Sequence, residues 1–147
     1  MSATITLTTV TNSIAALSIS GVTVLDSDQI PDSIGLNDHV LAPRPDGFLT
    51  ELEIEPAEMT KQNLDVRYRL HYQYYHCRIS GQLFANYSPM LEKLALIVHA
   101  FCSDATLTGA MDNGIPRIGT IGPIVDAAGN TYHGCEISID ILQFLEV

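Results

Sequence analysis

The longest regular pattern in the sequence is an alternation of apolar and polar residues over positions 64–74. A period of two places the two sets on opposite faces of a β-strand, and the run is longer than most strands. We expect a central strand over 64–75 with one face against a core and the other against water or another chain. The apolar set is Leu64, Val66, Tyr68, Leu70, Tyr72 and Tyr74, and the polar set is Asp65, Arg67, Arg69, His71 and Gln73.

The preceding segment, 49–55, also alternates and predicts a neighbouring antiparallel strand. Leu52 and Ile54 lie on one of its faces and three glutamates on the other. In a hairpin whose paired positions sum to about 120, the glutamates meet arginines of the central strand, and such pairs stabilise a sheet. The predicted pairs are Glu51 with Arg69 and Glu53 with Arg67, and Glu55 completes the acidic face.

Two segments have helical periodicity. The first covers about 8–18, with Gly21 just past its end. The second covers 88–103, with Ser88 as N-cap and Pro89 at the first helical position. This second helix is apolar on nearly all sides, so we expect it to pack against the sheet and also against a neighbouring subunit. Its predicted apolar stripe is Leu91, Leu94, Ala95, Val98, Phe101 and Cys102.

The remaining pattern predicts more strands and the fold class. Short strands are expected over 22–25 and 40–42, an irregular or edge strand over 118–125, and a last strand over 131–145. Turns are expected at 45–47, 112–114 and 126–130, and loops over 26–37 and 76–83. The order of elements indicates an α+β fold, a mainly antiparallel twisted sheet with two helices packed on one face. We expect residues 1–147 to form a single domain.

Composition narrows the function classes. The net charge is −10, and only seven Lys and Arg residues are present to meet phosphates, which argues against a protein that reads DNA. No apolar run is long enough to cross a bilayer, and the N-terminus lacks the basic region of a signal peptide. The three cysteines are odd in number and widely spaced, so we expect reduced, buried thiols rather than disulfides.

Candidate chemistry is sparse. Histidines and cysteines lie near one another at 76–77, 99–102 and 133–135, but none of these pairs has a CxxC or HExxH spacing. We therefore predict no metal site, no cofactor and no catalytic residue. A cysteine nucleophile with a histidine base remains an alternative, with His133 and Cys135 as its site. We expect the glutamates of 51–55 to form a solvated face paired with arginines, and a cation site is the alternative.

Several short stretches follow one another in the order seen in a family of phage proteins. They are residues 14–24, residues 40–48 with the sequence Val-Leu-Ala-Pro-Arg-Pro-Asp-Gly-Phe, residues 65–72, the helix after Tyr-Ser-Pro-Met at 87–90, and residues 121–124 followed by 132–136. Together they resemble the siphophage tail terminator, or tail completion, proteins over most of the chain.

This resemblance implies a structural virion protein and not an enzyme. Six copies form a ring at the head-proximal end of a long non-contractile tail tube, after assembly in the host cytoplasm. The ring ends tube polymerisation and offers a surface to the head–tail connector protein, and DNA passes through it without specific binding. The implied partners are further copies in a hexamer, the tail tube protein and the connector, with no membrane.

On this interpretation, the helix at 88–103 and the polar face of strand 64–75 are candidate subunit surfaces. Candidates to line or border the pore are the 51–55 glutamates or the acidic loop that carries Asp26, Asp28 and Asp32. The first alternative is another neck, head-closure or minor tail protein. The second is a small cytosolic Cys/His hydrolase.

Overall fold

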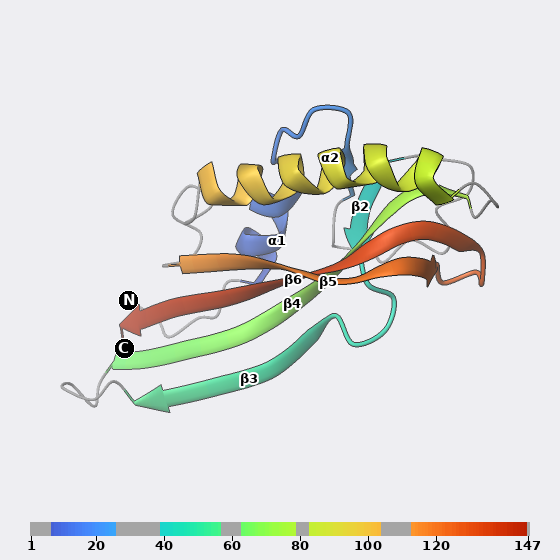
Figure 1. Cartoon of the computed structure of the whole chain (residues 1–147). Helices are drawn as coiled ribbons and strands as arrows, with labels where there is room; N and C mark the ends of the chain where they lie inside the picture. The colour runs from blue at the N-terminus through green and yellow to red at the C-terminus, as the bar shows by residue number, and fades with distance from the viewer. Residues whose placement is uncertain (1–6, 26–38, 57–62, 79–82, 104–112, 147) are drawn as a thin grey trace.

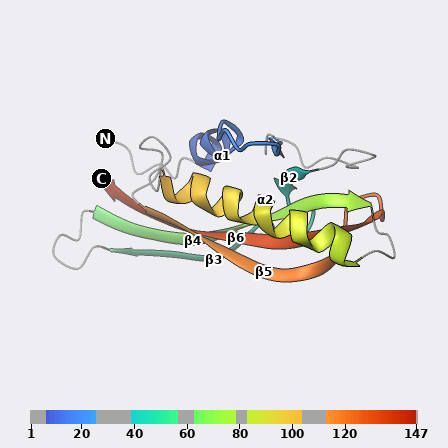
Figure 2. The same ribbon diagram turned by 45° about the horizontal axis from the view of Figure 1, so that its top comes forward.

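The computed structural model describes residues 7–25, 39–56, 63–78, 83–103 and 113–146 (Figure 1). The fold is α+β, as predicted, with a mostly antiparallel sheet and helices on one of its faces (Figures 1 and 2). The elements are α1 (Leu7–Ala15), β1 (Thr23–Val24), β2 (Val40–Pro43), β3 (Leu49–Pro56), β4 (Asn63–Arg78), α2 (Leu83–Ser103), β5 (Asn113–Val125) and β6 (Thr131–Glu146).

Strand β4 is the centre of the sheet, as the long alternation predicted. It pairs with β6 along its whole length, and β5 pairs with the far side of β6. On its other side β4 pairs with β2 and β3, and β1 adds a short parallel pair to β2. The register places Arg69 of β4 opposite Asp140 of β6. The two longest strands therefore bring distant parts of the sequence side by side.

Strands β2 and β3 follow the same edge of β4 one after the other, separated by a five-residue loop. The backbone of His71 in β4 holds both ends of this loop. Its carbonyl oxygen accepts a hydrogen bond from Arg44 N at 3.0 Å, and its N–H donates one to Phe48 O at 2.8 Å. Gly47 has a φ of +63°, which glycine adopts without the penalty that a Cβ brings. The predicted turn at 45–47 is thus confirmed, and it sets Arg44 beside β4.

The main core lies between the sheet and the helices. The even-numbered side chains of β4 and the odd-numbered side chains of β6 meet those of α1 and α2 here. Tyr68, Tyr72 and Tyr74 are all buried in it, so they pack rather than form an exposed aromatic platform. Each fully buried large apolar side chain contributes about 1.5–3 kcal/mol. The helix residues of this core are Val10, Ile14, Met90, Leu94, Ile97 and Phe101.

A smaller cluster lies on the opposite face of the sheet, at the end of β4 nearest α2's first turns. Tyr75 and Tyr132 meet edge-to-face there, with ring centroids 5.2 Å apart. The turn at 126–130, confirmed as predicted, is held by Asp126, whose carboxylate accepts hydrogen bonds from the backbone N–H of Asn130 and the hydroxyl of Tyr132. The cluster consists of Val40, Ala42, Tyr75, Ile124 and Tyr132.

The structure corrects several predicted boundaries. Helix α1 ends at Ala15, and Gly21 (φ +73°) belongs to a tight turn between Ile19 and Val22 instead. Helix α2 begins at Leu83 rather than Ser88, so Pro89 lies inside it. Proline removes one helical hydrogen bond, but burial of the neighbouring core residues on α2 outweighs that loss. Strand β4 extends to Arg78, where the sequence predicted a loop from 76.

The remaining predicted segments either lie where expected or fall outside the described residues. Strand β5 is an edge strand with an irregularity between Ile118 and Ile121, as predicted, but it begins at Asn113. The acidic loop with Asp26, Asp28 and Asp32, and Asp112 of the predicted turn, lie outside the described residues. Neither described helix is long and apolar enough to cross a membrane.

Candidate functional site

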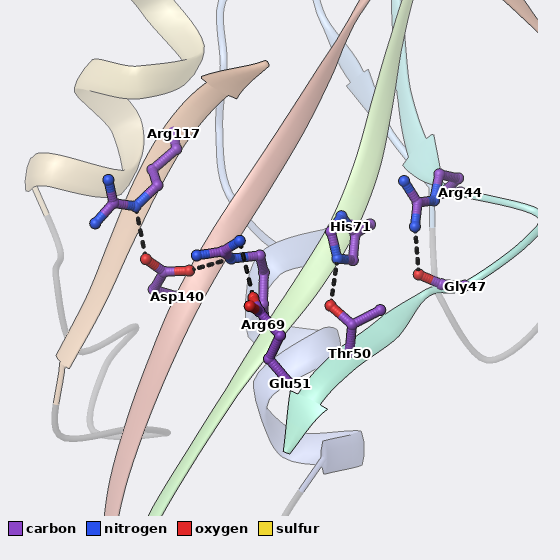
Figure 3. Close-up of polar contacts among 8 residues, drawn as sticks. All are labelled: Arg44, Gly47, Thr50, Glu51, Arg69, His71, Arg117 and Asp140. Carbon is purple, nitrogen blue, oxygen red and sulfur yellow. Dashed lines mark hydrogen bonds and ion pairs between the residues drawn. The ribbon is translucent and has the colours of Figure 1, made fainter. Parts of the chain in front are cut away.

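The sheet face turned away from the helices carries a chain of ion pairs that crosses four strands (Figure 3). A Glu51 carboxylate oxygen of β3 lies 2.8 Å from Arg69 Nη1 of β4. Arg69 Nε donates to Asp140 Oδ1 of β6 at 2.6 Å, and Arg117 Nε of β5 donates to Asp140 Oδ2 at 2.6 Å. We call this face the open face. Its four-residue network ties together β3, β4, β6 and β5.

The predicted cross-strand pairs are partly confirmed. Glu53 is the register partner of Arg67, as expected. Glu51 does contact Arg69, but the register partner of Arg69 is Thr50, because the pairing shifts between Thr50 and Glu53. Glu51 has a φ of +56°, which turns its carboxylate back over β4.

Glu55 faces a carboxylate rather than an arginine. Its register partner is Asp65, and like charges opposite each other destabilise a pair of strands. Residues 51–56 are all exposed, so water screens this repulsion. The acidic face of β3 is therefore solvated, as predicted, but only its first two glutamates have arginine partners or neighbours.

Asp140 is the residue of this network that sequence reasoning missed. Burial alone would raise the pKa of its carboxyl, but hydrogen bonds from Arg69 and Arg117 outweigh burial and hold the pKa below its ordinary value. In turn, the hydrogen bond to Asp140 raises the pKa of Arg69. In the sequence, Asp140 is one polar position of the predicted last strand, and its partners can be known only from the register between β4 and β6.

His71 continues the polar row toward β2. Its Nε2 lies 2.7 Å from the hydroxyl of Thr50, and the nearby Arg44 is 3.8 Å from a Glu136 oxygen. Burial, and then the positive charges of Arg44 and Arg69, lower the pKa of His71. The imidazole is thus held in its neutral form at neutral pH.

The open face is hollowed only slightly. A wide depression of about 350 Å³ lies over β3, β4, β6 and β5, and its rim carries charges of both signs. Arg69 and Arg117 already hold carboxylates there, so their charges are largely neutralised within the chain. Few of these cations are then left to neutralise other anions. The charged residues that line it are Glu51, Glu53, Arg67, Arg69, Arg117 and Asp140.

An apolar groove of about 530 Å³ runs between α2 and the edge strand β5. The predicted stripe on α2 is corrected here, because Leu94 and Phe101 belong to the core while Leu91, Ala95, Val98 and Cys102 turn toward β5. Leu91 keeps 55% of its surface exposed. The groove is lined by Leu91, Leu94, Ala95, Val98, His99, Cys102, Ile118 and Ile121. We call it the α2–β5 groove.

A second apolar surface lies at the opposite edge of the sheet. Leu52 and Ile54 of β3 are 50% and 49% exposed. Ile54 is the register partner of Val66, whose side chain belongs to the core on the helix side. The predicted hairpin register also places Leu52 and Ile54 on the face that carries Val66 and Tyr68, and the pairing with Val66 confirms this for Ile54. Both side chains nevertheless stay in solvent, because β3 lies at the edge of the sheet. We call them the β3 apolar edge.

The residues proposed for a hydrolase do not form a nucleophilic site. Cys135 is fully buried, and burial raises the pKa of its thiol to about 11. His133 is also buried, with its ring edge-to-face against Tyr87 at 5.5 Å. A nucleophilic cysteine needs a lowered pKa and an accessible sulfur.

The other candidate chemistry is equally limited. Within the described ranges, no three His, Cys, Asp or Glu side chains are placed to hold a metal ion. The expectation of buried thiols holds for Cys135 but is wrong for Cys102, which is exposed in the α2–β5 groove, and Cys77 is half-buried. None of the three cysteines, all of which lie within the described ranges, forms a disulfide. Among the described residues, the features that stand out are therefore exposed surfaces.

Comparison with known proteins adds no assignment. No protein-family model matches the sequence, and no curated protein shows significant similarity to it.

Proposed function

We propose that this chain is a siphophage tail terminator subunit, of which six copies form a ring at the head-proximal end of the tail tube. The ring ends tube polymerisation and presents the surface to which the head connector binds. The proposal starts from the sequence stretches that resemble tail terminators and is supported by the kind of surface that the fold leaves exposed.

The observation that carries the proposal is the exposure of apolar side chains at both edges of one sheet. The α2–β5 groove lies at one edge, and Leu52 and Ile54 lie at the other. Apolar patches of this kind mark surfaces that bind other proteins. Two different patches on one chain suit head-to-tail contacts between identical copies, and such contacts close into a ring when the rotation allows it.

The charge distribution agrees with a ring through which DNA slides. The net charge is −10, and the arginines at 44, 69 and 117 each lie beside a carboxylate. Few cations are then free to hold phosphates, so DNA meets little friction. Glu51, Glu53 and Glu55 border the pore in this proposal, and the open face lies toward it.

A neck or head-closure protein would use similar surfaces, and it is separated from a terminator by what it does to a growing tube. The tail tube protein of the same virus is polymerised with and without the purified chain, and tube length is followed by light scattering and negative stain. We expect elongation to stop at substoichiometric amounts of chain. Tubes of unchanged length in an excess of folded chain would refute the proposal.

The Cys135→Ala variant is the matched control for the hydrolase alternative. Because the thiol is buried and has no role in capping, this variant should stop elongation as the wild-type chain does. Loss of capping by a folded C135A chain would contradict the statement that this thiol has no role in capping.

A further inference from the structure

We propose that the α2–β5 groove of one copy receives the β3 apolar edge of the next copy, with Leu52 and Ile54 as the inserted side chains. This inference rests on the proposed ring and specifies the contact that builds it. The occupant is a second copy of this chain, for three reasons. The groove and the β3 apolar edge lie on the same side of the sheet, the charges beside them are opposite in sign, and the backbone of β5 favours a contact made by side chains.

The first argument is that the two apolar surfaces point to the same side of the sheet. Ile54 is paired with Val66, and Ile118 of the groove is paired with Ile137. Both Val66 and Ile137 belong to the core under the helices. When two copies lie edge to edge with their helices on the same side, Ile54 therefore meets the groove without either sheet turning over.

The second argument is that β3 and β5 carry charges of opposite sign on the open face. Glu53, the neighbour of Ile54, is paired with Arg67 and lines the depression of the open face with it. Arg117 of β5 lies on the open face as well, with its side chain 59% exposed. Arg117 shares the carboxylate of Asp140 with Arg69, so its exposed guanidinium can still meet a further carboxylate. In the edge-to-edge arrangement, the acidic row of β3 approaches that guanidinium while the apolar residues enter the groove. Complementary charges at the rim favour this register over alternatives.

The third argument concerns the backbone of β5. Pro116 and Pro123 lie within this edge strand, and its pairing with β6 shifts between Ile118 and Ile121. Proline cannot donate to a ladder, and irregular edge strands resist the addition of another strand. The contact at β5 is therefore made by side chains rather than by a continuous backbone ladder. This feature also disfavours uncontrolled sheet extension between copies.

The groove itself is suited to an apolar guest. Its lining is apolar apart from the imidazole of His99, and no carboxylate belongs to the described residues that line it. A glutamate row entering it would lose hydration without compensation, whereas Leu and Ile side chains gain by leaving water. The face of β3 that carries Leu52 and Ile54 is the one that fits.

Cys102 of the groove provides a direct test, because it is exposed there. In a chain with Cys77 replaced by serine, Ile54→Cys should form disulfides with Cys102 of the next copy when the protein caps tubes under mild oxidation. The matched control is Glu53→Cys, one residue away but on the opposite face of β3. Non-reducing gels read out the covalent species.

A ladder of covalent oligomers for I54C, with monomer alone for E53C, is the expected result. Capped tubes without I54C cross-links would overturn the inference while the proposed function stands. Cross-links from Cys102 to the tube protein, or a species that stops at the dimer, would also overturn it. Failure of the wild-type chain to cap tubes would instead overturn the proposed function, and this inference with it.

Discussion

Arg69 Nε donates a 2.6 Å hydrogen bond to Asp140 Oδ1 across the β4–β6 pair, where the two residues are register partners. Arg117 holds the other carboxylate oxygen at the same distance. One carboxylate therefore bridges two guanidinium groups on three adjacent strands, and Glu51 supplies the second negative charge of the network. Exposed ion pairs contribute little singly, but this network shares one well-aligned acceptor.

The Asp140→Asn variant tests how much that network contributes to the free energy of unfolding. We expect it to lower the free energy of unfolding by about 1 kcal/mol, near the upper end for partly exposed pairs, because two arginines lose a shared anion. Urea unfolding is the suitable measurement because urea leaves the ionic strength free to vary. The difference from wild type should shrink at about 1 M salt. Equal stability of the two chains at low salt would contradict this account.

Two glycines that face each other across β5 and β6 should respond differently to alanine. A Cβ at Gly134 would lie against Tyr74 O and Ile124 Cδ1, whereas one at Gly122 meets nothing within 4 Å. We expect G134A to destabilise the fold by about 1–3 kcal/mol through overpacking. The matched variant G122A should stay within about 1 kcal/mol of wild type. Thermal unfolding of the two proteins side by side decides the point, and equal effects would contradict the described register.

His71 should make stability depend on pH near neutrality. Burial and the charges of Arg44 and Arg69 place its folded-state pKa below the ordinary 6.5. The unfolded chain then binds the proton more readily, so stability falls as pH drops from about 7.5 toward about 5.5. The His71→Asn variant should lose part of this dependence. The free energy of unfolding of both proteins is measured in urea across that pH range. If it changes with pH equally in the two proteins, the pKa of His71 is not lowered by folding.

The α2–β5 groove can be tested by two matched leucines on the same helix. Leu91 lines the groove, whereas Leu96 is exposed but does not line it. The Leu91→Glu variant should weaken tube capping at least about tenfold, because a carboxylate buried without a partner is costly. The Leu96→Glu variant should cap almost normally. Circular dichroism checks that both fold, and equal loss of capping in both would remove the groove from the contact.

Much of the fold follows from local pattern. The alternation from Leu64 to Tyr74 predicts the central strand, and the alternating charges at 51–55 predict its neighbour. The boundaries of α2 do not follow in the same way, because Ser88 and Pro89 are a typical start signal. The earlier start at Leu83 reflects tertiary packing of the helix, which outweighs the local cap preference.

Only part of the candidate surfaces could be predicted from the sequence. Glu51 and Arg69 were predicted to meet, but the shift that brings Thr50 opposite Arg69 depends on a local strand irregularity. Asp140 is far from Arg69 in sequence, and nothing local marks it as the shared partner. The α2–β5 groove joins Leu91 to Ile118, so it exists only once the helix has packed on the sheet. Apolar residues on a helix do not reveal which of them stay exposed.

The most direct test of the ring is to image tube ends. Tubes polymerised from the tail tube protein of the same virus are incubated with the purified chain, and the ends are averaged from cryo-electron micrographs. The account predicts a six-fold ring with an open centre at one end of each tube. Bare ends, or chain bound along the tube wall, in the presence of saturating folded protein would contradict it.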